Sequence, residues 1–166
     1  MGMIALKWYW IVLFILIVFL LLSVLGRKSV HQEIFINATA ERVWEVLLDT
    51  DNYKDWNPTM ELIEGKVEEG QKVKYRFTQD ADNVSEIPSK VKQVVPNSLL
   101  NQGGGLPFIL TFDHKYILED SNGDTKLIIH EDYRGIWVHF WNPTPVEKAY
   151  GRLCSAIKEQ SEKESR

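Results

Sequence analysis

One uninterrupted apolar run near the start of the sequence constrains this chain more than any other feature. The run extends from Trp8 to Leu25, carries no charge, and has Ser23 as its only polar side chain. As an α-helix its 18 residues span about 27 Å, close to the roughly 30 Å hydrocarbon core of a bilayer. Aromatic residues open the run and Arg27 follows it, as at the two interfaces of a membrane span. The run therefore predicts a single-pass membrane anchor over residues 1–28.

A cleaved secretory signal is the alternative interpretation of this run. Lys7 followed by an apolar stretch resembles the basic and hydrophobic regions of such a signal. The run is longer than a usual hydrophobic region, however, and no A-x-A cleavage pattern follows it. We therefore expect an anchor, with the signal as the open alternative.

Basic residues around the run bear on the membrane side of the remaining chain. Lys7 alone precedes the run, whereas Arg27 and Lys28 follow it at once. Because basic residues favour the cytoplasmic side, this bias predicts a cytoplasmic C-terminal domain. The margin is one charge, and a signal-anchor orientation would place the domain outside. The single cysteine, Cys154, excludes an intrachain disulfide and suits a reducing compartment.

The rest of the chain is long enough for one domain and is acidic. Residues 29–166, with a core over about 30–162, fit the ordinary size of a single domain. Of the 19 Lys and Arg residues, 18 follow the apolar run, against all 23 Asp and Glu residues, so the net charge of residues 26–166 is −5. Nucleic-acid-binding domains present a basic surface, and we therefore predict no nucleic-acid partner.

Residue periodicity predicts that the domain begins with a strand and a short helix. From Val30 to Ile36 apolar residues alternate with mostly polar ones, which is typical of a strand. An apolar stripe at helical spacing follows over Ala40–Leu48, with Asn37 or Thr39 as its N-cap.

Strand-like runs separated by turn signals fill the middle of the domain, and a helical period closes it. Asn122-Gly123 is typical of a two-residue hairpin turn, and a long amphipathic helix is predicted from about Pro145 to Lys163. Between Gly103 and Gly105, three glycines permit a bulge, a sharp bend or close approach of a ligand. The predicted strands of this antiparallel meander are Met60–Val67, Lys72–Gln79, Val84–Val95, Ser98–Gln102, Phe108–Glu119 and Thr125–Ile136.

Two segments match the pattern of a known superfamily. Residues 36–60 read INATAERVWEVLLDTDNYKDWNPTM, which contains an I-x-A-x-x-x-x-V-W-x-x-L run followed by D-x-x-x-Y-x-x-W-N-P. Gly105, His114 and the segment HEDYRG at 130–135 are similar to a G…H…H-x-E-x-x-G pattern, with Asp132 in place of the usual Glu. The chain thus resembles the SRPBCC, or START-like, superfamily, which includes polyketide cyclase/dehydrase-like and birch-pollen-allergen-like proteins. The resemblance implies an α+β helix-grip fold, a curved antiparallel sheet of about six or seven strands around a long C-terminal helix.

A helix-grip fold implies an apolar cavity between the sheet and the C-terminal helix. Such cavities suit apolar ligands that a few polar groups orient. The superfamily includes lipid carriers, plant-hormone receptors, quinone-binding chaperones and aromatase/cyclases. Because these functions differ, the resemblance predicts the fold and does not identify one function. The residues expected to line the cavity are Phe112, His114, Tyr116, Ile129, Glu131, Tyr133, Tyr150, Leu153 and Ile157.

The predicted turn at Asn122-Gly123 places His114 opposite Glu131. If Asn122-Gly123 forms a type I′ turn, residues whose numbers sum to 245 lie opposite each other, and His114 faces Glu131 on the inward face. The pair can orient a ligand hydroxyl or carbonyl, or transfer protons in an enzyme, and a structural salt link explains it equally well. A one-residue shift would instead turn His130 and Asp132 inward as an alternative polar site. Neighbouring residues on a hairpin alternate faces, so we predict no metal site and no cofactor.

An aromatic segment between Trp137 and Trp141 precedes the last helix. It includes His139 and Phe140, and it predicts either a corner of the core or, in a tethered protein, a contact with the bilayer interface, where Trp prefers to lie.

These observations lead to three functional hypotheses. The first is a membrane-tethered domain that holds a hydrophobic small molecule, such as a lipid, quinone or aromatic metabolite, without catalysing a reaction. The second is a cyclase or dehydratase-type enzyme in which His114 and Glu131 transfer protons. The third is a protein-interaction module whose cavity is filled by its own side chains.

Overall fold

A computed structural model describes the backbone of residues 2–163 and the side chains of residues 8–163. The helices are α1 (Gly2–Leu25), α2 (Ala40–Leu48), α3 (Tyr53–Trp56) and α4 (Thr144–Glu162), with 3-10 turns η1 (Thr50–Asn52) and η2 (Ile136–His139). The strands are β1 (Arg27–Ile36), β2 (Met60–Glu64), β3 (Lys72–Thr78), β4 (Val84–Val95), β5 (Leu99–Leu106), β6 (Leu110–Ser121) and β7 (Asp124–Arg134). This is the predicted order of elements.

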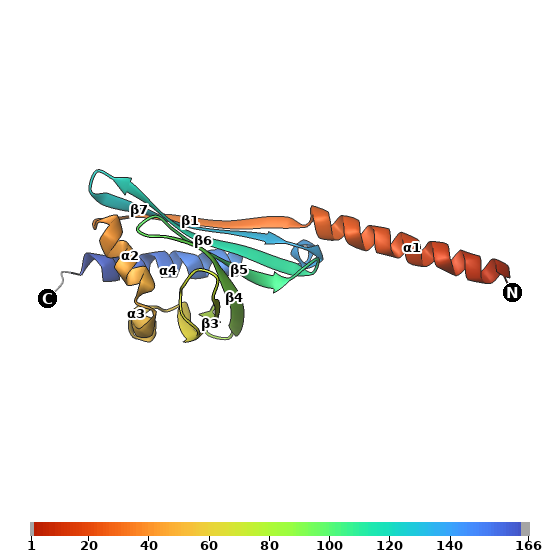
Figure 1. Ribbon diagram of the computed structural model, residues 1–166, viewed down its shortest axis with the longest axis horizontal. Coiled ribbons are helices and arrows are strands. Elements are labelled where there is room, and N and C mark those ends of the chain that lie inside the picture. Colours follow the sequence, from red (N-terminus) through yellow and green to blue (C-terminus); the bar gives the residue numbers. More distant parts are fainter. Residues whose placement is uncertain (1, 164–166) are drawn as a thin grey trace.

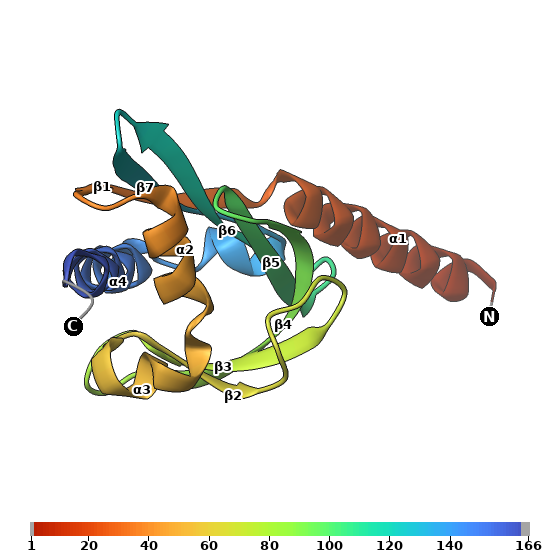
Figure 2. The same ribbon diagram turned by 60° about the vertical axis from the view of Figure 1, so that its left-hand side comes forward.

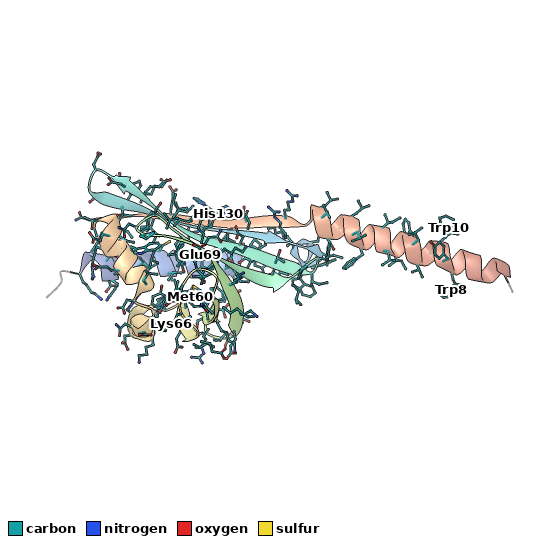
Figure 3. The ribbon with its side chains drawn as sticks, viewed as in Figure 1. Trp8, Trp10, Met60, Lys66, Glu69 and His130 are labelled. Atoms are coloured by element: carbon teal, nitrogen blue, oxygen red, sulfur yellow. The ribbon has the colours of Figure 1, made fainter. Side chains whose placement is uncertain are left out.

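Helix α1 projects from one end of the domain (Figure 1). Among the helices that the structure describes, it alone is long and apolar enough to cross a membrane, with a mean hydropathy of 2.8 over Trp8–Leu25. Trp8 and Trp10 lie near its free end, far from the domain (Figure 3). Its side chains from Trp8 to Leu25 are mostly exposed, because α1 contacts the domain at its C-terminal end.

The strands form one antiparallel sheet in the order β1-β7-β6-β5-β4-β3-β2. The sheet curves around α4, so that β1 and β7 lie on one side of the helix and β2 and β3 on the other (Figure 2). This confirms the α+β helix-grip fold. The curvature follows from the right-handed twist that every strand carries, increased by bulges in β2 and β4.

Helix α2 begins where the sequence predicts it. The Thr39 hydroxyl accepts a hydrogen bond from the Arg42 backbone N–H at 3.3 Å, so Thr39 rather than Asn37 is the N-cap. Tyr53 in α3 donates its hydroxyl to the Leu47 carbonyl at 2.6 Å, which fixes the helical turn after α2 against the core.

The turn between β6 and β7 has the predicted geometry. Asn122 and Gly123 have φ angles of 56° and 95°, as a type I′ turn requires at its two central residues. The register that follows pairs Glu119 with Lys126 and His114 with Glu131. The turn thus sets which residues of both strands face α4.

The three glycines lie inside β5, which is longer than the predicted strand. A Cβ atom on Gly104 would lie 2.5 Å from the Pro88 carbonyl oxygen and 3.1 Å from the Phe112 ring. The glycines therefore allow β4 and the Phe112 ring to approach the β5 backbone closely, and strand pairing continues to Leu106.

Gly105 offers a test of this close approach. Gly105→Ala places a methyl group against the Leu110 carbonyl oxygen and 2.8 Å from the Thr111 Cα, at a φ of +98°. Gly123→Ala is the matched control, since Gly123 has a φ of +95° and a methyl group there would have nothing within 4 Å. Denaturant unfolding in detergent should show a loss of about 1–2 kcal/mol for the control and a clearly larger loss for Gly105→Ala. Equal losses would show that the conformation of Gly105 matters and the close packing does not.

Candidate functional site

A cavity of about 360 Å³ lies between the curved sheet and the first turns of α4. Its wall is mainly aromatic and aliphatic, with contributions from β3 to β6, from Tyr133 on β7 and from Val146 on α4. Ligand pockets in proteins typically measure about 300–1,000 Å³ and have this kind of lining. The described side chains leave this space open, which contradicts the hypothesis of a filled cavity.

Glu131 is the buried carboxylate of the cavity wall, and two tyrosines donate hydrogen bonds to it. Tyr133 on β7 donates its hydroxyl to the Glu131 Oε2 atom at 2.5 Å, and Tyr150 on α4 donates to the same oxygen. Tyr133 lies two residues after Glu131 and therefore on the same face of the strand. The two hydroxyls offset the cost of burying a carboxylate, whose side chain is 5% exposed.

His114 lies opposite Glu131 on β6 and is equally buried. Its Nδ1 atom is 3.7 Å from Glu131 Oε2, too far for a direct hydrogen bond. The imidazole packs edge-on against Tyr116 and Tyr150, with ring centroids 4.6 Å and 5.2 Å away. Its Nε2 atom is buried and has no hydrogen-bond partner among the residues that the structure describes. It is the only such orphaned side-chain atom, within the described part of the chain, that belongs to the cavity wall.

Burial also affects the ionisation of the two tyrosines. Desolvation raises the pKa of Tyr150 well above its ordinary value, and the negative charge of Glu131 raises it further. The same two causes raise the pKa of Tyr133. Both hydroxyls therefore remain protonated donors to Glu131 at neutral pH.

The structure separates the nine predicted cavity residues into two groups. Six line the cavity: Phe112, His114, Tyr116, Glu131, Tyr133 and Tyr150. Ile129, Leu153 and Ile157 do not line it and lie instead in the fully buried core. Leu153 and Ile157 are about one and two turns beyond Tyr150, along the helix that packs against α2 and β1. The structure thus places Leu153 and Ile157 in the core beside the cavity, where α4 packs against α2 and β1.

The alternative polar site does not form in the cavity. His130 and Asp132 lie on the outer face of β7, since the register of the hairpin has no one-residue shift. His130 Nε2 is 3.3 Å from Asp132 Oδ1, and its Nδ1 is 3.4 Å from the Nδ1 atom of His31 on β1. His130 is labelled in Figure 3.

Sequence reasoning missed several residues of the wall. Gln102 on β5 pairs with His114 and is 4% exposed, while Tyr75 and Phe77 project from β3 and Trp141 packs against Tyr133. The alternation of Val73, Tyr75 and Phe77 carried a signal for an inward face. No pattern in the sequence indicated that Gln102 faces inward, because a polar residue in a strand ordinarily faces solvent.

Comparisons with known proteins agree with this architecture. Residues 27–162 match the family described as polyketide cyclase/dehydrase and lipid transport. No curated protein sequence matches the chain.

Several solved structures share the fold at low sequence identity. The Zhui aromatase/cyclase from Streptomyces sp. R1128 aligns with a TM-score of 0.67 at 18% identity, covering 84% of this chain and 96% of that one. Norcoclaurine synthase from Thalictrum flavum aligns with a TM-score of 0.66 at 15% identity, covering 84% and 89%. The protein Ara h 8.0201 aligns with a TM-score of 0.60 at 16% identity, covering 82% and 98%. Such identities show a common fold alone.

The buried tyrosines predict how the fold responds to alkali. Five of the six tyrosines, Tyr53, Tyr75, Tyr116, Tyr133 and Tyr150, have a pKa raised first of all by burial. A raised pKa in the folded state means that stability is complete below the unfolded value of about 10 and falls as the pH rises above it.

We therefore expect the tyrosinate absorption of these side chains to appear together with loss of the near-ultraviolet circular dichroism signal, as one cooperative step above about pH 10. The variant with both Tyr133→Phe and Tyr150→Phe should lose stability less steeply with pH. Gradual tyrosinate formation in a protein that keeps its native signal would contradict the burial described above.

Proposed function

Since this chain belongs to the polyketide cyclase/dehydrase and lipid transport family, we propose that it is a membrane-tethered domain whose cavity binds an apolar molecule carrying a hydroxyl or carbonyl group. The observation that carries the proposal is the orphaned Nε2 atom of His114, a residue that lines the cavity. A buried polar atom without a partner costs about 1–3 kcal/mol. A ligand oxygen that pairs with this atom removes that cost.

The surroundings of His114 define what kind of ligand fits. Glu131 already accepts two tyrosine hydroxyls, whereas the His114 imidazole has a nitrogen without a partner among the described residues. The rings of Phe112, Tyr116 and Trp141 add flat apolar surface to the cavity wall. Flat aromatic molecules with one or two oxygen atoms match this combination. The norcoclaurine synthase structure, which shares the fold, holds dopamine and hydroxybenzaldehyde, two molecules of that kind.

The tether is the second part of the proposal. We assign residues 1–28 to an anchor and residues 29–166 to the binding domain, with α1 spanning the bilayer. An anchored domain meets membrane-dissolved ligands at a higher effective concentration than a diffusing one. Arg27 and Lys28 favour the cytoplasmic side for the domain, and a reporter that is active only in the cytoplasm, fused after Arg166, should therefore be active. An inactive reporter of normal abundance would place the domain outside.

A conversion of the ligand is the second candidate function. A buried His and Glu on one cavity wall, with two tyrosine hydroxyls on the Glu, are the groups that proton transfer in a cyclase or dehydratase needs. A carrier returns its ligand unchanged, whereas an enzyme yields a product. Product formation that requires both His114 and Glu131 would favour the enzyme.

Binding of three related probes tests the proposal. Naphthalene, 1-naphthol and 1,4-naphthoquinone share a fused ring and differ in oxygen atoms. We expect His114→Phe, which replaces the imidazole by an aromatic ring without nitrogens, to weaken binding of the two oxygen-bearing probes about tenfold, equivalent to about 1.4 kcal/mol. Naphthalene should bind the variant at least as well as the unaltered chain. Titration calorimetry on the detergent-solubilised full chain measures all three.

The matched control is His130→Phe, which makes the same substitution on the outer face of the sheet. It should leave the affinity for every probe unchanged. The proposal fails if the ratio of 1-naphthol to naphthalene affinity is the same in the unaltered chain and in His114→Phe. Unfolding measurements on both variants check that the fold is intact.

A further inference from the structure

Five large apolar side chains are exposed together at one end of the domain. Leu106, Phe108 and Ile109 lie at the β5–β6 turn, and their exposed fractions are 68%, 57% and 40%. Trp137 and Phe140, in and just after η2, are 55% and 75% exposed. Backbone hydrogen bonds join the two segments, from Ile136 N–H to the Phe108 carbonyl and from Trp137 N–H to the Ile109 carbonyl, each at 3.0 Å. We call these five side chains the apolar rim.

The apolar rim lies beside the point where α1 enters the domain. His139 of η2 makes a 2.9 Å hydrogen bond to the Leu22 carbonyl oxygen, and Phe108 shares a surface depression with Ser23 and Val24. Figure 1 shows α1 leaving the domain at this end.

The connection between α1 and the sheet leaves little freedom. Only Gly26 separates α1 from β1, and its carbonyl accepts the Gly135 backbone N–H at 3.1 Å. A Cβ atom on Gly26 would collide with the Gly135 carbonyl oxygen, so the two backbones are in close contact. A bilayer that contains α1 therefore lies next to the apolar rim.

The charge of this end differs from that of the rest of the domain. The segments 103–112 and 133–146, which carry the rim, contain no Asp or Glu, although the chain has 23 of them. Arg27 and Arg134 pair across β1 and β7 at this end, and both are exposed. The acidic β6–β7 turn, with Glu119 and Asp124, lies at the opposite end (Figure 1). Apolar side chains flanked by arginines match the acyl chains and phosphates of a membrane interface.

The wall of the cavity continues into the apolar rim. Gly105 and Leu110, which flank the rim residues of the β5–β6 turn, both line the cavity. Trp141, which follows Phe140, lines it too and packs on Tyr133 with ring centroids 4.5 Å apart. A ligand that leaves the bilayer at the rim is thus next to the cavity.

We infer that the apolar rim is inserted in the interface of the bilayer that holds α1, and that the cavity loads from that bilayer at this end. The inference rests on the membrane tether of the proposed function. It adds a defined contact surface, a lipid bilayer as the partner, and a route for the ligand.

Site-specific spin labels test this placement in the full chain. Cys154 is buried and burial raises its pKa to about 12, so a cysteine introduced by Phe140→Cys is the one that reacts at neutral pH. Glu119→Cys, at the exposed opposite end, is the control. Each labelled protein is placed in phosphatidylcholine nanodiscs, at one chain per disc, and its collisions with oxygen and with a water-soluble nickel chelate are compared by power saturation.

We expect the label at Phe140 to show several-fold less collision with nickel, and more with oxygen, than the label at Glu119. Equal nickel collision at the two sites in discs that have incorporated the chain would overturn the inference and leave the tether standing. Failure of the chain to enter discs would overturn the tether and the inference together. Protection of Phe140 that appears only in discs holding two chains would identify a contact between copies instead and would also overturn it. Probe binding in detergent is independent of each of these outcomes.

Discussion

The pairing of β6 with β7 is the constraint on which the polar part of the cavity depends. It is anchored by a two-residue turn at Asn122-Gly123 and runs without a shift from Ser121 to Thr111. Because side chains alternate between the faces of a strand, this register sends His114 and Glu131 inward and His130 and Asp132 outward. A slip of β7 by one residue would turn His130 and Asp132 inward in place of Glu131. The geometry of one surface turn therefore decides which charged groups α4 covers.

Helix α4 supplies the second hydrogen-bond donor to Glu131. Tyr150 reaches from the helix to Glu131, and Tyr133 reaches it from the same strand, so the carboxylate is held by donors from two elements. These bonds immobilise Glu131 and leave the imidazole of His114 without a protein partner for Nε2 among the described residues. In the proposed function this atom would select a ligand by its oxygen, and the aromatic wall would select it by shape and apolar area.

Local patterns in the sequence were sufficient to predict the elements and the hairpin register. The period of two, the helical stripe of Ala40–Leu48 and the turn at Asn122-Gly123 each act over a few residues, and the structure confirms them. The extent of the cavity could not be predicted in this way. Leu153 and Ile157 share the inward face of α4 with Tyr150, and only the packing of α2 and β1 around them shows that they belong to the core. Gln102 reaches the cavity through the pairing of β5 with β6, which continues across three glycines beyond the predicted end of the strand.

The short junction at Gly26 joins α1 to the sheet that forms the cavity wall. A long flexible linker would only confine the domain near the membrane, and its orientation would average out. Here α1 passes into β1 through one residue, and β1 pairs along its whole length with β7, the strand that carries Glu131 and Tyr133. The direction of α1 in a bilayer would thus be transmitted to the sheet through backbone hydrogen bonds. In such an arrangement β7, the strand that positions Glu131, would also set the angle at which the cavity meets the lipid. Anchoring and ligand selection would then depend on one structural element.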